Sequence, residues 1–324
     1  MSVATRDMGK TAGKALKGAV LIAGPTASGK SALAQRLARE LGGTVVNADS
    51  MQVYSILNVL TARPEPAELA AAPHLLYGHV HPSQSYSTGQ WLRDVAALAE
   101  GGAFAGRRPI FTGGTGLYFK ALVEGLSRMP DISAEIRERW RARLTADGAP
   151  ELHRRLQRDD PEAARRIRPA DGQRIVRALE VLEASGRPIT AWQGERGQAV
   201  VDRDSARHIV IVPDREQLAG RIFSRFGRMV EAGAMEEVRE LLSLGLAPSM
   251  PAMKAIGVPE LRDAIEGRCG VAEAMERAAT TTRQYAKRQS TWFRNQLGPE
   301  WLRIADPDMV QAEELRLPPE STEG

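Results

Sequence analysis

Strand signals and helix signals alternate along most of the chain. Residues 19–24 are continuously apolar and end in glycine, which is typical of a strand buried on both faces of a parallel sheet. Residues 31–43 then show helical spacing of apolar positions and end at two glycines. Further strands are predicted at 44–49, before Thr112, and at 207–213, where Asp214 follows as the N-cap of a helix. The alternation predicts an α/β fold with a parallel sheet covered on both faces.

The middle of the chain departs from this alternation. Residues 131–200 contain no strand pattern and instead show helical periodicity rich in arginine, with acidic residues that almost balance the arginines. We interpret this segment as an all-helical subdomain inserted between two parts of the sheet. The predicted organisation is a disordered tail at 1–17, the first part of the core at 18–130, the helical insertion at 131–200, the second part of the core with a C-terminal basic helix at 201–310, and a second disordered tail at 311–324.

Composition limits the classes of function. The chain has 324 residues, of which 43% are hydrophobic and 26% charged, as in ordinary globular proteins. Its single cysteine, Cys269, excludes a disulfide framework and a cysteine-based zinc site. No apolar run approaches the roughly 20 residues that span a bilayer, and the first residues lack the apolar stretch of a secretory signal. We therefore expect a cytoplasmic protein with no membrane partner. The net charge of +4 is only a weak indication of an anionic partner.

A phosphate-binding loop follows the first predicted strand. The pattern Gly24-x4-Gly29-Lys30-Ser31 stands between a strand and a helix, the context in which a P-loop match is credible. Its backbone amides and the helix N-terminus favour phosphate oxygens. Lys30 would reach a terminal phosphate and Ser31 would ligate Mg²⁺. The loop predicts a P-loop NTPase-like core and a ligand with a phosphate chain, but does not identify what the phosphate is attached to.

Polar residues follow two other strands. Asp49 stands at the carboxyl end of a strand, the edge where open parallel sheets bind ligands, and is a candidate proton acceptor or Mg²⁺ partner; it is also suited to capping the next turn. Thr115 is placed to bond a leaving-group oxygen or to cap the following helix. Arg221 and Arg225 share one face of a later helix, so they would reach a phosphate cleft or form a solvated stripe.

A basic aromatic helix is predicted near the C-terminus. Residues 283–294 carry four cationic side chains and no acid, interleaved with Tyr285, Trp292 and Phe293. Basic residues bind phosphate backbones and aromatic side chains stack on unpaired bases, so the segment favours an RNA contact. Trp292 and Phe293 are equally suited to the core, and we expect at least one of them to be buried.

Taken together, these segments resemble the bacterial tRNA dimethylallyltransferases. The motifs that carry the resemblance occur in family order between Ala19 and Trp301: GPTASGKS, DSMQVY, AAPHLLYG, GGTGLYFKALVEGLS, DGQRIVRALEV, KAIGVPEL and TRQYAKRQSTWFRN. The resemblance implies transfer of a dimethylallyl group from dimethylallyl diphosphate to N6 of adenosine 37 in tRNAs that read codons beginning with U.

The resemblance also assigns roles to residues around the phosphate loop. It implies that the loop binds the allylic diphosphate, with Mg²⁺ at Ser31, and that no nucleoside triphosphate is hydrolysed. Asp49 would accept the proton of the adenine amino group, while Thr115 and Arg225 would stabilise the leaving diphosphate. The implied diphosphate-binding residues are Gly24, Pro25, Thr26, Ala27, Ser28, Gly29, Lys30 and Ser31.

The partner implied by the resemblance is the anticodon stem-loop of tRNA, gripped by the helical insertion and the basic helix while the target base leaves its stack. The implied tRNA-binding residues are Asp49, Ser50, Met51, Gln52, Thr115, Arg137, Gln173, Arg174, Ile175, Val176, Arg177, Lys254, Ala255, Ile256, Gly257, Val258, Lys287, Arg288, Gln289, Ser290, Thr291, Trp292, Phe293 and Arg294.

Two positions depart from the family pattern. Leu60 stands where a glycine is usual, which bears on the local backbone path, and Val258 replaces a tyrosine, which bears on one tRNA contact. Two other functions fit parts of the sequence: a P-loop kinase for a nucleotide or small molecule, and a non-enzymatic RNA-binding P-loop switch. A kinase has no evident use for the acid-free helix, and no guanine-specificity motif is recognisable. We expect a monomeric enzyme.

Overall fold

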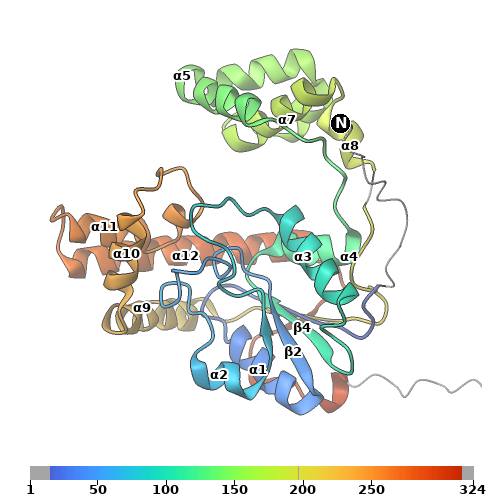
Figure 1. Ribbon diagram of the computed structural model, residues 1–324, viewed down its shortest axis with the longest axis vertical. Helices are drawn as coiled ribbons and strands as arrows, with labels where there is room; N and C mark the ends of the chain where they lie inside the picture. The colour runs from blue at the N-terminus through green and yellow to red at the C-terminus, as the bar shows by residue number, and fades with distance from the viewer. Residues whose placement is uncertain (1–14, 196, 316–324) are drawn as a thin grey trace, which may run out of the picture. The chain divides into compact units, whose positions relative to one another are not determined.

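A computed structural model describes residues 15–195 and 197–315 of the protein (Figure 1). The chain divides into two compact units, one formed by residues 124–199 and the other by the remainder of the described chain. The insertion therefore starts seven residues earlier than the predicted boundary at 131 and ends at 199. Because both of its ends return to one unit, the larger unit is assembled from two separate stretches of sequence.

A parallel sheet forms the centre of the larger unit. Over residues 15–195 and 197–315 it has six strands in the order β3-β2-β4-β1-β5-β6. β1 pairs with both β4 and β5, so that Val20 lies opposite Ile110 on one side and Arg207 on the other. The strands are β1 (Val20–Ala23), β2 (Gly43–Asn47), β3 (His74–Leu75), β4 (Arg108–Gly113), β5 (Arg207–Ile211) and β6 (Leu302–Ile304). The predicted α/β fold with a parallel sheet is confirmed.

Side chains of β1 alternate between two apolar cores, as the period of a strand requires. Val20 and Ile22 pack with Leu33 and Leu37 of α1 (Lys30–Leu41) on one face of the sheet. Leu21 and its neighbours pack on the other face, against side chains from α3 (Thr88–Glu100), α4 (Gly116–Glu124) and the C-terminal part of α12 (Val271–Gln296). This burial on both faces explains why the sequence of β1 is apolar throughout.

A third core joins three later helices of the larger unit to the first half of α12. Side chains from α9 (Arg215–Glu231), α10 (Ala234–Ser243), α11 (Val258–Ile265) and the first half of α12 pack against the loop that carries Val53, Tyr54 and Leu57. Outside this core the larger unit has the short helix α2 (Pro66–Ala71), which has no buried residue. Short 3₁₀ turns of the larger unit include Ala252–Lys254, Pro307–Met309 and Glu313–Leu315. Asp214 caps α9 by accepting hydrogen bonds from the Glu216 and Gln217 amides, in agreement with its predicted N-cap position.

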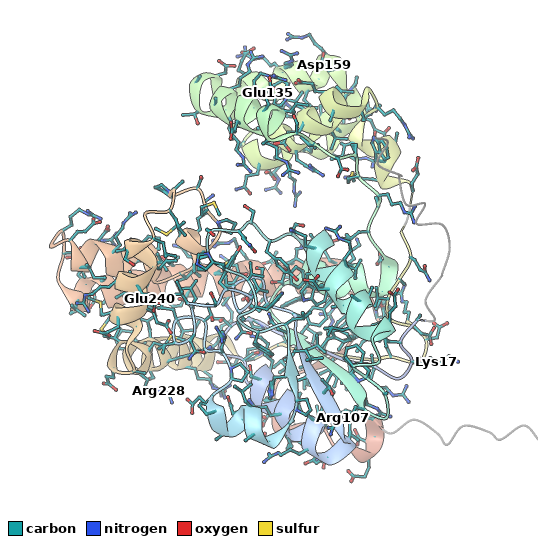
Figure 2. The ribbon with its side chains drawn as sticks, viewed as in Figure 1. Lys17, Arg107, Glu135, Asp159, Arg228 and Glu240 are labelled. Atoms are coloured by element: carbon teal, nitrogen blue, oxygen red, sulfur yellow. The ribbon has the colours of Figure 1, made fainter. Side chains whose placement is uncertain are left out.

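The smaller unit is helical in its described part, as predicted. It consists of α5 (Ala134–Asp159), α6 (Pro161–Arg166), α7 (Gly172–Ser185) and α8 (Ile189–Gln193), around a core that includes Trp140 and Leu152. Many of its arginines pair with acids one helical turn away; for example, Arg139 lies 3.6 Å from Glu135 and Arg155 lies 3.2 Å from Asp159. Figure 2 labels these two acids among the side chains of the smaller unit. The arginine-rich sequence is thus largely a salt-bridged helix surface.

The ends of the described chain are more ordered than the sequence indicated. Leu16, predicted to belong to the first tail, donates a backbone hydrogen bond of 2.8 Å to the Val200 carbonyl. Residues 311–315, assigned to the second tail, include the buried Ala312 and Leu315, and Arg108 donates a side-chain hydrogen bond of 2.7 Å to the Leu315 carbonyl. Apolar contacts with the α1 face hold this segment in place. The rest of both predicted tails, 1–14 and 316–324, lies outside the described residues.

Trp91 of α3 connects the core to the end of β2. It stacks on Tyr118 with ring centroids 4.1 Å apart and donates an indole hydrogen bond of 2.8 Å to the Asn47 carbonyl. We expect Trp91→Phe to lower the free energy of unfolding by about 2 kcal/mol, because a buried carbonyl loses its donor and the smaller ring leaves a void. Urea unfolding followed by circular dichroism measures the difference.

Tyr118→Phe is the matched control within the same stack. The Tyr118 hydroxyl is buried and has no hydrogen-bond partner among the described residues. Its removal should therefore change the free energy of unfolding by less than about 0.5 kcal/mol. Equal losses from the two substitutions would contradict the role given to the indole hydrogen bond.

Candidate active site

The phosphate loop connects the central strand β1 to the N-terminus of α1. Gly29, the residue before α1, has a φ of +89°, a conformation that favours glycine. An ideal Cβ at Gly29 would also meet the Pro307 ring at 2.9 Å, so the C-terminal segment packs directly on the loop. The Ser28 side chain is fully buried, and its hydroxyl has no partner among the described residues. A buried hydroxyl without a partner inside a phosphate loop is the group that a bound phosphate would satisfy.

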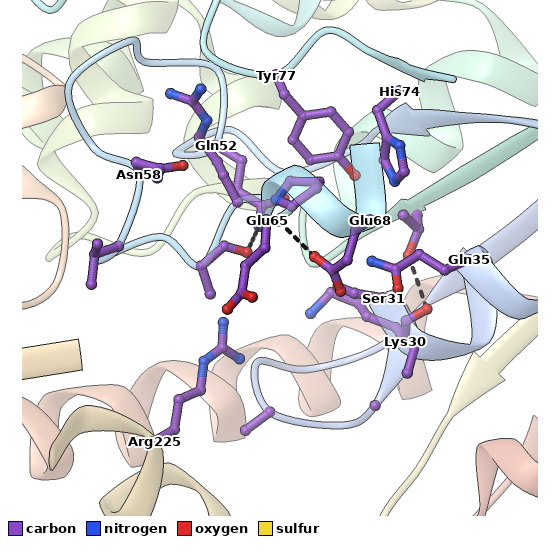
Figure 3. A pocket seen from close by; sticks show the side chains of 18 of the residues that line it. Lys30, Ser31, Gln35, Gln52, Asn58, Glu65, Glu68, His74, Tyr77 and Arg225 are labelled. Carbon is purple, nitrogen blue, oxygen red and sulfur yellow. Dashed lines mark hydrogen bonds between the residues drawn. The ribbon is translucent and has the colours of Figure 1, made fainter. Parts of the chain in front are cut away.

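A cavity of about 410 Å³ begins at this loop (Figure 3). Lys30 and Ser31 form one side, and Arg225 enters from α9. The cationic side chains on its wall outnumber the carboxylates, which suits an anionic ligand. Its charged lining residues are Lys30, Arg63, Arg225 and Arg228, against Glu65 and Glu68. His74 and Tyr77 complete the wall near α2.

Burial destabilises the positive charges of this site. The Lys30 ammonium donates a 3.1 Å hydrogen bond to the Pro25 carbonyl, and its pKa is lowered to about 8, chiefly by burial and only partly offset by the attraction of Asp49. Burial likewise lowers the pKa of Arg225, again opposed by Asp49. A bound phosphate-type anion would supply the negative partner that these two buried cations need.

Asp49 and Thr115 lie together at the carboxyl ends of β2 and β4. The Asn47 side chain fixes the Asp49 backbone through two hydrogen bonds, accepting from the Asp49 amide at 2.8 Å and donating to its carbonyl at 2.9 Å. The Thr115 hydroxyl accepts a 2.9 Å hydrogen bond from the Ser50 amide, which ties the turn before α4 to the residue after Asp49. One Asp49 carboxylate oxygen accepts from the Met51 amide at 2.9 Å, so Asp49 does cap its own turn. The other oxygen lies beside Gly114, 3.2 Å from where a Cβ would stand.

The residues of the predicted site thus form two adjoining groups. Lys30, Ser31, Gln52 and Arg225 line the cavity. Asp49 and Thr115 are not among the cavity's lining residues, although the Asp49 charge acts on both Lys30 and Arg225. The arrangement offers an anion cradle with a carboxylate next to it, which suits the departure of a phosphate-type leaving group coupled to removal of a proton.

Comparison with known proteins identifies the family. A model of the IPP transferase family matches residues 52–296, and an isopentenyl transferase model matches residues 17–77. The chain belongs to the IPP transferase family. It is 60% identical over 296 residues to a tRNA dimethylallyltransferase of Mesorhizobium japonicum, covering 91% of this chain and 92% of that protein. It is 63% identical over 286 residues to one of Chelativorans sp., covering 88% and 98%.

Solved structures of IPP transferases share the fold. A tRNA isopentenylpyrophosphate transferase from Bacillus halodurans superposes with a TM-score of 0.64 at 31% identity, covering 93% of both chains. A eukaryotic dimethylallyltransferase, described as acting on tRNA, superposes with a TM-score of 0.73 at 25% identity, covering 90% of this chain and 75% of that one.

The basic helix α12 presents two different sides. Lys287, Arg288 and Arg294 are exposed. A groove of about 340 Å³ runs beside them, lined by Lys287, Arg288, Thr291, Trp292, Asn295 and Gln296. Phe293 is buried in the sheet core, and the Trp292 ring packs on Gly116, where an ideal Cβ would lie 2.1 Å from it. Of the two aromatic residues, Phe293 therefore belongs to the core. Trp292 packs partly on the core and also lines the groove.

The other residues predicted to contact tRNA also divide by exposure. Arg137, Gln173, Arg174 and Lys254 are exposed, and Arg177 is half-buried. The Gln52 amide is engaged with the Thr61 and Ala62 carbonyls, each at 2.9 Å. In this structure several of the predicted contacts have side chains that face the protein interior rather than a surface, namely Ile175, Val176, Ala255, Val258, Gln289 and Phe293.

Both departures from the IPP transferase pattern are accommodated by packing. The Leu60 side chain is buried over Gly257, where an ideal Cβ would meet it at 2.7 Å. Val258 lies in the core, and Pro259 occupies the first turn of α11, where a missing N–H costs nothing. The backbone before Leu60 is held by Glu237 of α10, whose carboxylate accepts hydrogen bonds of 3.0, 2.5 and 3.0 Å from the amides of Asn58, Val59 and Leu60.

Sequence reasoning missed Glu237 and the cavity residues Arg63, Glu68, His74 and Tyr77. Glu237 stands in an ordinary amphipathic helix, and nothing local marks it. A signal was present for His74 and Tyr77, because both lie in the family motif AAPHLLYG, but their spacing alone does not specify a role. Burial raises the pKa of the Tyr77 phenol, with Asp49 and Glu68 acting in the same direction, so Tyr77 stays protonated at the cavity wall.

The lowered pKa of Lys30 has a consequence for stability. Below pH 8 the folded, ligand-free protein carries a buried ammonium, whereas the unfolded chain keeps the ordinary pKa of 10.5. Lys30 therefore destabilises the fold below pH 8, and this effect disappears as the pH rises toward 10.5. Part of the Lys30 residue is accessible to water, which screens the charge and reduces the size of this effect. We therefore expect Lys30→Met to raise the free energy of unfolding by about 1–2 kcal/mol at pH 7 and by nearly nothing at pH 10.5.

Urea titrations at the two pH values measure this difference. Lys17→Met, at an exposed lysine, is the matched control and should leave the free energy of unfolding unchanged at both. A loss of stability in Lys30→Met at pH 7 would show that the Lys30 charge is already compensated in the ligand-free protein.

Proposed function

We propose that this chain is a tRNA dimethylallyltransferase. It transfers the dimethylallyl group of dimethylallyl diphosphate to N6 of adenosine 37 in tRNAs that read codons beginning with U. A C–N bond forms between the donor's C1 and N6, the C1–O bond breaks, and diphosphate leaves with the bonding electrons. The observation that carries the proposal is a cationic phosphate-loop cavity with a fixed carboxylate beside it. The names of relatives 60% and 63% identical to the chain support it.

The phosphate loop acts on the leaving group. An allylic carbon releases diphosphate readily when the departing charge is neutralised, and preorganised donors do this without reorganising at the moment of reaction. Lys30 and Arg225 supply positive charge, and the backbone amides before α1 supply oriented dipoles. Both cations gain from a bound anion because burial disfavours their charges.

Mg²⁺ fits the oxygen donors beside the loop. Ser31, Thr112 and Glu68 line the cavity that begins at the loop, and Mg²⁺ takes one or two protein oxygens together with substrate phosphates and water. No group of three or more histidine, cysteine, aspartate or glutamate side chains over residues 15–195 and 197–315 forms a metal site by itself. We propose that Ser31 provides the protein ligand. When bound, the ion neutralises diphosphate charge.

Asp49 is the proton acceptor in this proposal. The adenine amino group is a poor nucleophile, so its proton must be taken as the new bond forms. Asn47 and Met51 fix the Asp49 backbone and one carboxylate oxygen, which leaves the oxygen beside Gly114 for the substrate. The target base must leave its stack to reach this oxygen, at a cost of a few kcal/mol. Exposed cations of α12 bind the RNA backbone while the base is displaced.

The described residues 15–195 and 197–315 include no helix with both the length and the apolar character needed to cross a bilayer. We propose that the enzyme acts as a monomer in the cytoplasm, where its tRNA substrate is found.

Asp49→Asn tests the assignment of the base. With unmodified tRNA, Mg²⁺ and radiolabelled dimethylallyl diphosphate, we expect the rate of label transfer to tRNA to fall by about 10²–10⁴-fold, because the amide cannot accept the proton. Affinity for inorganic pyrophosphate, measured by calorimetry, should be unchanged or higher, since a negative charge near the anion site is removed. Near-normal turnover would exclude Asp49 as the base.

A parallel reaction with γ-labelled ATP tests the reaction class. The wild-type chain should transfer no phosphate to a small acceptor while it prenylates tRNA. Label passing from ATP to an acceptor, with none entering tRNA from the allylic donor, would make the chain a kinase and overturn the proposal.

A further inference from the structure

One buried amide joins three parts of the active site. Gln289 projects from α12, and the residue is 6% exposed. Its carbonyl oxygen accepts a 3.0 Å hydrogen bond from the Thr26 amide in the phosphate loop. Its amide nitrogen donates a 2.9 Å hydrogen bond to the Gly114 carbonyl, in the turn before Thr115. Because the three segments are far apart in sequence, this contact is built by the tertiary fold.

The chemistry of the contact selects a carboxamide. The Thr26 amide needs an acceptor and the Gly114 carbonyl needs a donor, and glutamine presents both on one planar group. An ionised glutamate could not donate, and a lysine or arginine could not accept. The approach is also close, because an ideal Cβ on Gly114 would lie 2.1 Å from the Gln289 nitrogen. The turn and the helix are therefore in close contact at this point.

We propose that Gln289 is a positioning residue for the donor site and not a tRNA contact. It holds the first half of the phosphate loop in its anion-binding shape and fixes the loop to the turn that carries Thr115. The same helix exposes Lys287 and Arg288, so the cations that face the RNA and the loop that faces the donor share one rigid support. The inference rests on the proposed function only for the identity of the two substrates.

Gln289→Met separates the two roles. Methionine is nearly isosteric but makes neither hydrogen bond. We expect affinity for inorganic pyrophosphate, measured by calorimetry, to fall about tenfold, while affinity for an anticodon stem-loop RNA, measured by fluorescence anisotropy, stays within about twofold. The KM for dimethylallyl diphosphate should rise more than kcat falls. Hydrogen exchange should speed up in peptides that contain Thr26 and remain unchanged in the centre of α1.

Gln284→Met is the matched control, since Gln284 lies on the exposed side of the same helix. It should alter neither affinity. Loss of RNA affinity in Gln289→Met with unchanged pyrophosphate affinity would make Gln289 a tRNA contact and overturn the proposal. Unchanged values for both ligands would also overturn it. A wild-type chain that binds no pyrophosphate would contradict the proposed function instead, so the two failures are distinguishable.

Gln289→Glu provides a second test if the methionine variant does not fold. A protonated glutamate keeps one donor and one acceptor, whereas the ionised form keeps only acceptors. Burial and the neighbouring Gly114 carbonyl raise the pKa of a carboxyl group placed here. We therefore expect weaker pyrophosphate binding than in the wild type at pH 8, with the difference shrinking at pH 5.5 as the carboxyl group protonates. A difference that is equal at both pH values would contradict the need for a donor to Gly114.

Discussion

The carboxyl ends of β2 and β4 come together because β4 ends in residues that have no side chain. An ideal Cβ on Gly113 would lie 2.0 Å from the Ala48 carbonyl oxygen, which is closer than any carbon can approach. With glycine there, the Thr115 amide reaches that carbonyl at 3.2 Å and the Thr115 hydroxyl reaches the Ser50 amide. Gly116 then lets Trp292 of α12 pack against the start of α4. The position of Asp49 beside the phosphate loop depends on this close approach.

The same close packing explains the electrostatics of the site. Segments that approach so closely exclude water from the groups between them, and burial then disfavours isolated charges. Lys30 and Arg225 both have lowered pKa values for this reason, and Asp49 compensates each only in part. Positive charge that is buried without a full partner lowers the stability of the fold. The same charge raises the affinity of the site for an anion. Stability and anion affinity are therefore opposed at Lys30, as they often are where proteins preorganise charge for a ligand.

The features that could be predicted from the sequence are those that neighbouring residues determine by themselves. The phosphate loop, the buried strand before it and the helix after it follow from contiguous residues, as does Asp214 at the start of α9. The two-residue strand β3 and the three-residue strand β6 were missed because they depend on pairing with β2 and β5 rather than on their own patterns. The contacts of Glu237 and Gln289 were missed for the same reason. Their partners are amides more than 170 residues away, and no local spacing reveals such contacts.

The distribution of arginine shows why charge composition alone was a poor guide to RNA binding. In the smaller unit, arginines such as Arg139, Arg155 and Arg166 have acidic partners at i±4, so much of their charge is compensated within the protein. Residues 283–294 of α12 contain no acid that could play this part. Cations without acidic neighbours release condensed counterions when they meet phosphates, which makes their contribution to RNA affinity large and dependent on salt. The smaller unit holds more arginine, but α12 has the charge pattern suited to a polyanion. Gln289 connects that same helix to the phosphate loop and to the turn before α4.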